Sequence, residues 1–521
     1  MSRPREASSA GENDAALPVE ALFTVAGGAA VVVAATVSGM LLMLAGRGLF
    51  TRAFEPGEYG LFSLAFTVTS ILTVVATLGL RNGIPRQVAF HNSHASEAGL
   101  TPASIITWGF LATLLASGVV CVVLWLGAPF LAHLFGHPEY TIAFRVAAVS
   151  VPGLALIRSS TAVYRGFNRT RERVVFQELL QKGSFPLLLS IVVYSQAGLV
   201  AALLAFPTSL FLTAVAYSVY TLRFDPGAFR EKVVTSIGRP SDGYELLAFS
   251  FPLLFASLLI QIMTWTDILM LGYFKTATEV GIYDAVRPLV ELMAVIWGGM
   301  IFLYTPIASG LTAEEAMESI RRVYFALTKW FASLTFPFAI TFLLFPDLVL
   351  RATFGAEYAV GAVALQVLAV AFFLGHVMGP NGATLTALGH TRVLMWANLV
   401  AAIANIILNV WLIPAHGIVG AALATATALV VRNLIRVGIV YVVSGAHSFQ
   451  RPMLVPMGIT VVAGIGTHVF VSPLITSPLQ LLPVVVALLV VYGASLVSLG
   501  FVSEADRALL AWAGEQLPLQ R

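Results

Sequence analysis

Ionisable side chains stand inside long apolar stretches of this sequence, and they are the groups that could bind charged molecules or ions. A charge that faces lipid in the middle of a bilayer costs about 2.5–3.5 kcal/mol, so each should face a cavity, a partner or the membrane surface. Guanidinium groups bind phosphate oxygens through paired hydrogen bonds, and burial raises the proton affinity of a carboxylate. The residues of this kind are Arg145, Arg158, Glu178, Lys182, Asp267, Arg287, Glu291, Arg432 and Arg436.

The deepest of these charges lie in two neighbouring apolar segments. Arg287 and Glu291 are four residues apart and therefore share one face of a helix. Glu291 lies about 15 Å inside its segment, near the middle of a membrane. Asp267, in the preceding segment, lies at a depth similar to that of Arg287. We predict an Asp267–Arg287–Glu291 cluster on a cavity wall, with Arg287 binding an anion and Asp267 or Glu291 carrying a coupling ion. A purely structural ion pair between adjacent helices is the alternative.

Arginines near the inner ends of their segments are further candidates for the wall of the cavity. Arg158 lies about two turns from the inner end of its segment. Arg81 and Arg86 follow another segment, where they could meet an entering anion or serve as ordinary charges of the inner surface. Arg145 is close enough to the outer surface for its head to reach water, and Glu178 and Lys182 are spaced to pair.

Composition places the whole chain in a membrane. Hydrophobic residues make up 58% of the 521 residues and charged residues 11%, whereas soluble domains carry about 25% charged residues. A soluble enzyme is therefore excluded, and continuous rather than alternating apolar runs argue against an outer-membrane barrel. We expect an all-α polytopic membrane protein with about 14 transmembrane helices, near 25–49, 59–80, 104–126, 142–164, 176–195, 198–221, 247–272, 281–304, 325–346, 361–385, 394–414, 417–440, 453–472 and 479–501.

The distribution of Lys and Arg predicts the orientation. With the N-terminus inside, nineteen basic residues lie in inner loops and tails, and only Arg47, Arg52, Lys275 and Arg351 lie outside. Basic residues of short loops favour the cytoplasm. Both termini are therefore expected to be cytoplasmic, in a multi-pass protein of the cytoplasmic (plasma) membrane. This bias also accounts for the net charge of +3 without any nucleic-acid partner.

An internal repeat divides the chain. Glu58–Phe62 matches Glu279–Tyr283 at an offset of 221 residues, and two further pairs match in the same order. The offset spans six helices, so both copies face the same way, as two parallel bundles with a site between them. The expected organisation is a cytoplasmic tail 1–24, a first bundle 25–222, a linker 223–246, a second bundle 247–440, two additional helices 441–502 and a cytoplasmic tail 503–521.

Several motifs resemble a known family. Residues 52–62 (RAFEPGEYGLF) resemble the first outer loop of the polysaccharide (O-antigen type) flippases of the multidrug/oligosaccharidyl-lipid/polysaccharide exporter superfamily. The similarity continues through 79–83 with Arg86, 165–167, 249–253, 267–274 with Asp267, and 413–425. It covers about residues 25–440.

This resemblance implies a flippase that moves a polyprenyl-(pyro)phosphate-linked oligosaccharide by alternating access between two bundles, for surface polysaccharide or glycoprotein glycan synthesis. Its partners would be this lipid-linked oligosaccharide, membrane lipids and other polysaccharide-assembly proteins. The alternatives are a multidrug/cation antiporter of the same superfamily, a peptidoglycan-precursor flippase, and a membrane-embedded glycan polymerase or ligase. Mostly basic charges within the first bundle disfavour a cationic substrate, and the lack of a large loop disfavours an enzyme.

Motifs for cofactors and metals are missing from the sequence. No G-x-x-x-x-G-K-[ST] loop is present, so ATP hydrolysis is not expected. His91 and His94 have no Cys or carboxylate partners at ligand spacing. We therefore predict a transporter that uses neither a cofactor nor a bound metal.

Overall fold

The computed structural model describes residues 19–93, 100–167, 169–223, 240–309, 315–446, 451–470 and 480–498, and these form helices and turns only. The first half comprises α1 (Val19–Ala53), α2 (Pro56–Ala76), α3 (Leu80–Ser93), α4 (Pro102–Leu134), η1 (Pro138–Tyr140), α5 (Thr141–Gly166), α6 (Thr170–Arg173), the π-helix η2 (Val174–Gln181), α7 (Lys182–Tyr194) and α8 (Gly198–Arg223).

The second half comprises α10 (Pro240–Phe274), α11 (Ala277–Ser309), α12 (Glu315–Leu344), α13 (Pro346–Thr353), η3 (Ala356–Gly361), α14 (Ala362–Val377), α15 (Asn381–Ala387) and α16 (Thr391–Ser444). Two helices follow it, α17 (Arg451–Phe470) and α18 (Leu481–Ser498).

These helices account for the predicted number of membrane crossings. Nine of the described helical stretches are long and apolar enough to span a membrane. The charged helix α11, the η2–α7 pair, α17 and α18 add four more. The fourteenth arises because α16 turns back at Gly417, whose φ of 54° favours glycine. The expectation of an all-α polytopic membrane protein is confirmed.

Two helices begin inside segments that were predicted as a tail and a linker. α1 begins at Val19, inside the predicted tail 1–24, and α10 begins at Pro240, inside the predicted linker 223–246. A helix can continue from lipid into water, so the limits of an apolar stretch do not mark its ends. Proline at the first position of α10 is compatible with a helix start. Residues 503–521 lie outside the described residues.

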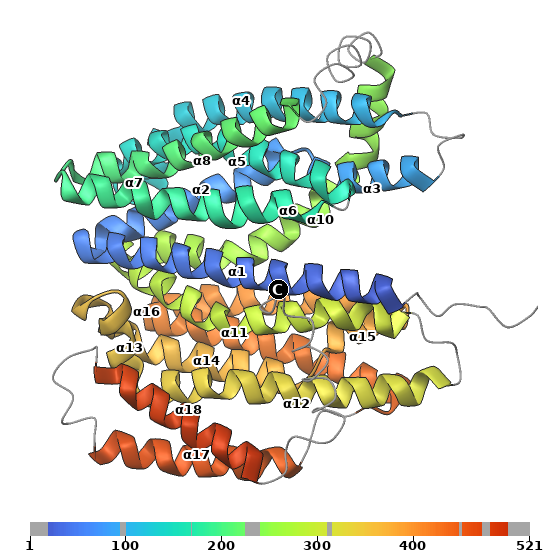
Figure 1. Cartoon of the computed structure of the whole chain (residues 1–521). Helices are drawn as coiled ribbons and strands as arrows, with labels where there is room; N and C mark the ends of the chain where they lie inside the picture. The colour runs from blue at the N-terminus through green and yellow to red at the C-terminus, as the bar shows by residue number, and fades with distance from the viewer. Residues whose placement is uncertain are drawn as a thin grey trace, which may run out of the picture.

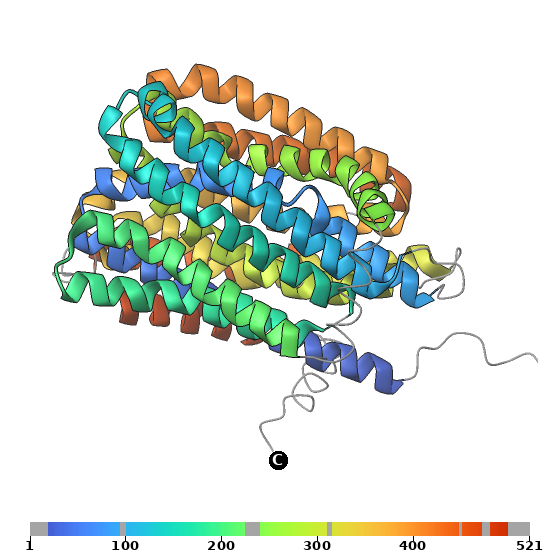
Figure 2. The same ribbon diagram turned by 90° about the horizontal axis from the view of Figure 1, so that it is seen from above.

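The helices run roughly side by side along one direction, as Figures 1 and 2 show. In Figure 1, α2, α4, α5, α7 and α8 gather in the upper part, and α11, α12, α14 and α16 in the lower part, with α17 and α18 beyond α12. α1 packs between the two groups, against α7 and α11. α10 also joins them, because it contacts α2, α3 and α4 as well as α11 and α16.

The two halves approach most closely where α2 crosses α11. A Cβ atom added at Gly60 would collide with the carbonyl oxygen of Ala277, and one added at Gly281 would collide with the carbonyl oxygen of Pro56. The contact is reciprocal, because each glycine meets the carbonyl four residues before the other glycine. Gly60 and Gly281 are also equivalent positions of the sequence repeat. At this crossing the backbones of α2 and α11 are therefore in direct contact and are related by an approximate two-fold axis.

We predict that Gly60→Ala lowers the thermal unfolding midpoint of the purified protein in detergent, because the added methyl group forces the two backbones apart. Overpacking of this kind costs about 1–3 kcal/mol. Gly127→Ala in α4 is the matched control, since no atom lies within 4 Å of its added Cβ. That change should be neutral or slightly stabilising. Equal midpoints for the two variants would contradict the close crossing.

Candidate functional site

A stripe of charged side chains runs along one face of α11. Asp284, Arg287 and Glu291 are spaced three and four residues apart, which places them on the same side of the helix. The helix start is fixed locally, because the Thr276 hydroxyl accepts a hydrogen bond from the Glu279 backbone N–H at 3.3 Å. Because α11 begins directly after the short turn that follows α10, the position of this turn sets how far along α11 each charge of the stripe lies.

The first member of the stripe forms a buried ion pair between the two halves. Arg47 of α1 donates from Nη1 to Asp284 Oδ2 at 3.0 Å and to the Asp284 carbonyl at 3.2 Å. The Tyr59 hydroxyl of α2 donates to the same carboxylate at 3.0 Å. The side chains of Arg47 and Asp284 are only 12% and 4% exposed. The sequence analysis counted Arg47 among the outer-loop charges. In the structure Arg47 lies within α1, where the ion pair with Asp284 stabilises its buried charge.

The next two members of the stripe pair more loosely. Arg287 Nη2 lies 3.4 Å from Glu291 Oε1, and the Arg287 guanidinium lies 4.8 Å from the centre of the Trp265 ring. Arg287 Nη1 is buried and has no hydrogen-bond partner among the described residues. The Glu291 side chain is 46% exposed although it lies well inside α11. Open space therefore adjoins this pair, and Arg287 keeps donor capacity for an anion.

Asp267 belongs to a separate cluster, which corrects the predicted grouping with Arg287 and Glu291. Its carboxylate accepts hydrogen bonds from the Tyr283 hydroxyl at 2.9 Å, from the Asn405 amide at 3.2 Å and from the Asn409 amide at 2.8 Å. The Thr425 hydroxyl makes a fourth contact. Neutral donors of α11 and α16 thus surround this carboxylate of α10, and Arg287 acts on it only through the electrostatic field.

The Asp267 cluster has the composition of a small cation site. Asp267 is 5% exposed, and none of the described ion pairs involves it. The Asn409 Oδ1 atom is buried and has no hydrogen-bond donor among the described residues. A buried carboxylate normally has a charged partner or a bound proton. A hard cation could bind the oxygen atoms of the carboxylate, of Thr425 and of the two asparagines if the two amides, whose nitrogens donate to Asp267, turned over.

Several guanidinium groups gather near the inner end of the first half. Arg158 of α5 and Arg81 of α3 act on each other electrostatically, and Arg165 is affected by both Arg81 and Arg173. Arg158 makes one long contact, from Nη1 to the Ser70 carbonyl at 3.5 Å. None of the described ion pairs involves Arg81, Arg158 or Arg165.

The remaining predicted charges lie outside these groups. Arg86 is exposed on α3. The Arg145 guanidinium lies 4.7 Å from the centre of the Trp125 ring on α4, and its extension to water stays a prediction. Lys182 pairs with Glu178 at 2.6 Å, as their spacing predicted. His94 lies outside the described residues, and those residues include no cluster of three His, Cys, Asp or Glu that could hold a metal.

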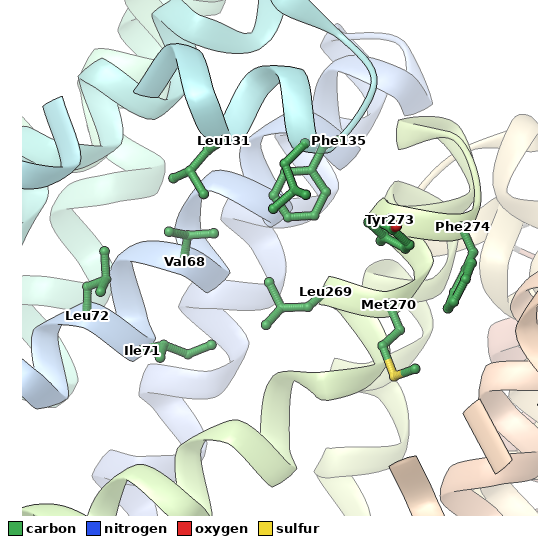
Figure 3. A pocket seen from close by; sticks show the side chains of 10 residues that line it. Val68, Ile71, Leu72, Leu131, Phe135, Leu269, Met270, Tyr273 and Phe274 are labelled. Atoms are coloured by element: carbon green, nitrogen blue, oxygen red, sulfur yellow. The ribbon is translucent and has the colours of Figure 1, made fainter. Parts of the chain in front are cut away.

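Two cavities among the described residues have mainly apolar walls, and neither is lined by the predicted arginines. One, of about 490 Å³, lies between α2, α4 and α10 (Figure 3). The other, of about 510 Å³, lies between α12, α14 and α16. The open space beside Glu291 is therefore distinct from both of them.

Sequence reasoning missed several residues of these polar clusters. Tyr283, Asn405, Asn409 and Thr425 are uncharged, and Asp284 lies too near the start of its segment to look costly. A detectable signal was present, because Asn405 and Asn409 are amides spaced i, i+4 inside an apolar run. Such a pair places two hydrogen-bonding groups on one helix face, where an apolar environment requires a partner.

Comparisons with known proteins identify related families. The family described as "Polysaccharide biosynthesis protein" matches residues 25–309, more than half of the chain, and the family "MatE" matches residues 252–411. A curated relative, the probable low-salt glycan biosynthesis flippase Agl15 of Haloferax volcanii, is 24% identical over 77% of this chain and 80% of its own length. The teichuronic acid biosynthesis protein TuaB of Bacillus subtilis is 29% identical over 24% of this chain and 25% of its own length.

Solved structures show the same fold. The lipid II flippase MurJ, in an inward closed conformation, superposes with a TM-score of 0.68 and 15% identity, over 94% of this chain and 100% of its own. An inward-facing multidrug resistance MATE family transporter superposes with a TM-score of 0.56 and 16% identity, over 82% of this chain and 97% of its own. Both share the helical membrane architecture described above.

We predict that Arg47→Ala destabilises the protein by about 3–5 kcal/mol, because it leaves the Asp284 carboxylate buried without a cation. The double variant Arg47→Met/Asp284→Asn removes both charges and should recover most of that loss. Unfolding midpoints in detergent measure both effects. A wild-type midpoint for Arg47→Ala would contradict the buried pair.

Proposed function

The chain belongs to the polysaccharide biosynthesis protein family, and we propose that it is a flippase that moves a lipid-linked oligosaccharide across the membrane. The single observation that carries the proposal is the family match, over more than half the chain, with which the similarity to a probable glycan biosynthesis flippase over 77% of the chain agrees. The activity is transport rather than catalysis. The carrier is a polyprenyl (pyro)phosphate, whose negative charge suits the arginines described above.

The arrangement of guanidinium groups supports an anionic substrate. Arg81, Arg158 and Arg165 lie together without a described carboxylate partner, and Arg287 retains an unused donor. Planar guanidinium groups bind phosphate oxygens through two parallel hydrogen bonds. In this proposal the inner arginines receive the head group, with Arg86 at the entrance, and Arg287 binds it beside the open space at Glu291.

The two halves would act as two bundles, 25–222 and 247–440, joined by the segment 223–246. α2 and α11 form their contact at one end, and Asn82 donates to Ser257 at 3.1 Å at the other. Alternating access requires these contacts to separate in turn. The two helices within 441–502 would lie beside the second bundle, where α17 and α18 pack against α12.

A multidrug or cation antiporter is the second candidate, because the family "MatE" matches residues 252–411. A cationic substrate would require carboxylates in the cavity of the first half. The clustered side chains there are arginines, and Glu178 is already paired with Lys182. The lipid-linked glycan is therefore favoured, whether it serves a surface polysaccharide, a glycoprotein or a cell wall.

The multi-pass protein is proposed to lie in the cytoplasmic membrane with both termini in the cytoplasm. The excess of Lys and Arg in the predicted inner loops supports this orientation. Other polysaccharide-assembly proteins would deliver its substrate and accept its product.

We predict that Arg287→Ala reduces flipping about 10- to 100-fold, since a hydrogen bond to a charged group contributes about 1.5–3 kcal/mol. Proteoliposomes with a fluorescent polyprenyl-pyrophosphoryl sugar measure this rate, from the fraction of lipid protected from a quencher outside. Arg145→Ala is the matched control, because Arg145 lies on α5 against Trp125 and should retain transport. Transport unchanged in Arg287→Ala would exclude its anion-binding role.

Asp267 is our candidate for the coupling ion in preference to Glu291, because it is buried and forms none of the described ion pairs, whereas Glu291 is partly exposed and pairs with Arg287. We expect Asp267→Asn to abolish the acceleration of flipping by a Na⁺ or proton gradient, while Glu291→Gln retains it. Flipping rates with and without each imposed gradient test this. A wild-type gradient response in Asp267→Asn would rule out the assignment.

A further inference from the structure

An apolar groove lies between the two halves. Its volume is about 490 Å³, and its walls come from α2 and α4 of the first half and α10 of the second (Figure 3). Val68, Leu72, Leu131 and Leu269 are among the side chains around it, and only Tyr273 among the lining residues carries an oxygen or nitrogen atom in its side chain. Tyr273 and Phe274 are partly exposed at its edge, so the groove opens toward the surroundings.

The deep side of this groove lies beside unsatisfied hydrogen-bond donors. Trp265 lies one helical turn from Leu269 on α10, and its ring contacts Phe66 at 5.6 Å and Arg287 at 4.8 Å. Trp265 Nε1 and Arg287 Nη1 are both buried and without partners among the described residues. Orphaned buried donors of this kind indicate a missing acceptor. The apolar side chains of the groove could bind a long hydrocarbon chain, and the two donors beside it could bind an anionic group on the same molecule.

We propose that this groove binds the isoprenoid chain of the lipid-linked substrate while its pyrophosphate lies near Trp265 and Arg287. The inference rests on the proposed function and adds to it the site that receives the hydrocarbon part. The Phe66–Trp265 contact then forms the boundary between the chain and the charged head group.

Depth distinguishes this occupant from an ordinary phospholipid. Trp265 lies nine residues before the end of α10, which is about 14 Å along the helix. A phospholipid keeps its phosphate at the membrane surface, so its charged group would not reach the two donors. Only a lipid whose phosphate enters the protein would place the first units of its chain at the deep side of the groove.

The second apolar cavity supplies a matched control. It has a similar volume, about 510 Å³, but it lies within the second half, between α12, α14 and α16. Its lining includes Val370 and Val430. Membrane lipid can fill both cavities, whereas the isoprenoid chain should bind in the first alone.

Photocrosslinking tests the assignment directly. Full-length protein carrying p-benzoylphenylalanine at Met270 or at Val430 is placed in nanodiscs of phosphatidylethanolamine and phosphatidylglycerol with geranylgeranyl-pyrophosphoryl-N-acetylglucosamine. We expect mass spectrometry after irradiation to find prenyl adducts at position 270 and only phospholipid adducts at position 430. Phospholipid adducts alone at position 270, or prenyl adducts equally at both positions, would overturn the proposal.

A groove-filling substitution provides the second measurement. Leu269→Trp should slow flipping of the same lipid, labelled on its sugar, about tenfold, the change that about 1.4 kcal/mol produces. Val370→Trp should leave the rate unchanged. If wild-type protein flips the lipid and Leu269→Trp flips it equally fast, the groove inference fails while the proposed function stands. If wild-type protein does not flip it, the proposed function fails, and the adducts still decide whether the groove binds prenyl chains.

Discussion

The backbone contact of α2 with α11 at Gly60 and Gly281 determines how the polar groups of the two halves meet. Asp284 lies three residues beyond Gly281 on α11, and Tyr59 precedes Gly60 on α2, so the crossing places them in hydrogen-bond contact at 3.0 Å. The same approach lets Arg47 of α1 reach Asp284. A larger residue at either glycine would widen the crossing and separate these groups, because protein interiors are close-packed.

The cost of burying a charge made much of the fold and part of the site predictable from sequence. The lengths of the apolar runs predicted the segments that cross the membrane. The repeat predicted that Gly60 and Gly281 occupy equivalent positions, and the structure shows these two glycines in contact. The same cost rule selected Arg287, Glu291 and Asp267, since each lies deep in an apolar run. It could not assign their partners, because a depth along one helix does not fix which way a side chain points.

Partners from distant segments explain why the rest of the site was not predictable. The Asp267 carboxylate accepts hydrogen bonds from Asn405 and Asn409, which follow it by 138 and 142 residues, and from Thr425, which lies beyond the turn at Gly417. Neutral amides and hydroxyls cost less free energy than charges when they lie in an apolar segment, so the sequence alone gives little reason to expect that they bind a partner. With these donors available, Asp267 needs no contact with Arg287, and the expected single cluster separates into two.

The two polar clusters place different conditions on a movement of the halves. The Asp267 cluster lies wholly within the second half, so such a movement leaves it intact. The Arg47–Asp284 pair joins the halves, and separating a buried pair without replacement partners costs about 3–5 kcal/mol. Water or an anion must therefore reach the pair as it opens. Glu291 lies on the same face of α11 and is 46% exposed, so the open space beside the stripe lies about two helical turns from the pair that must be solvated.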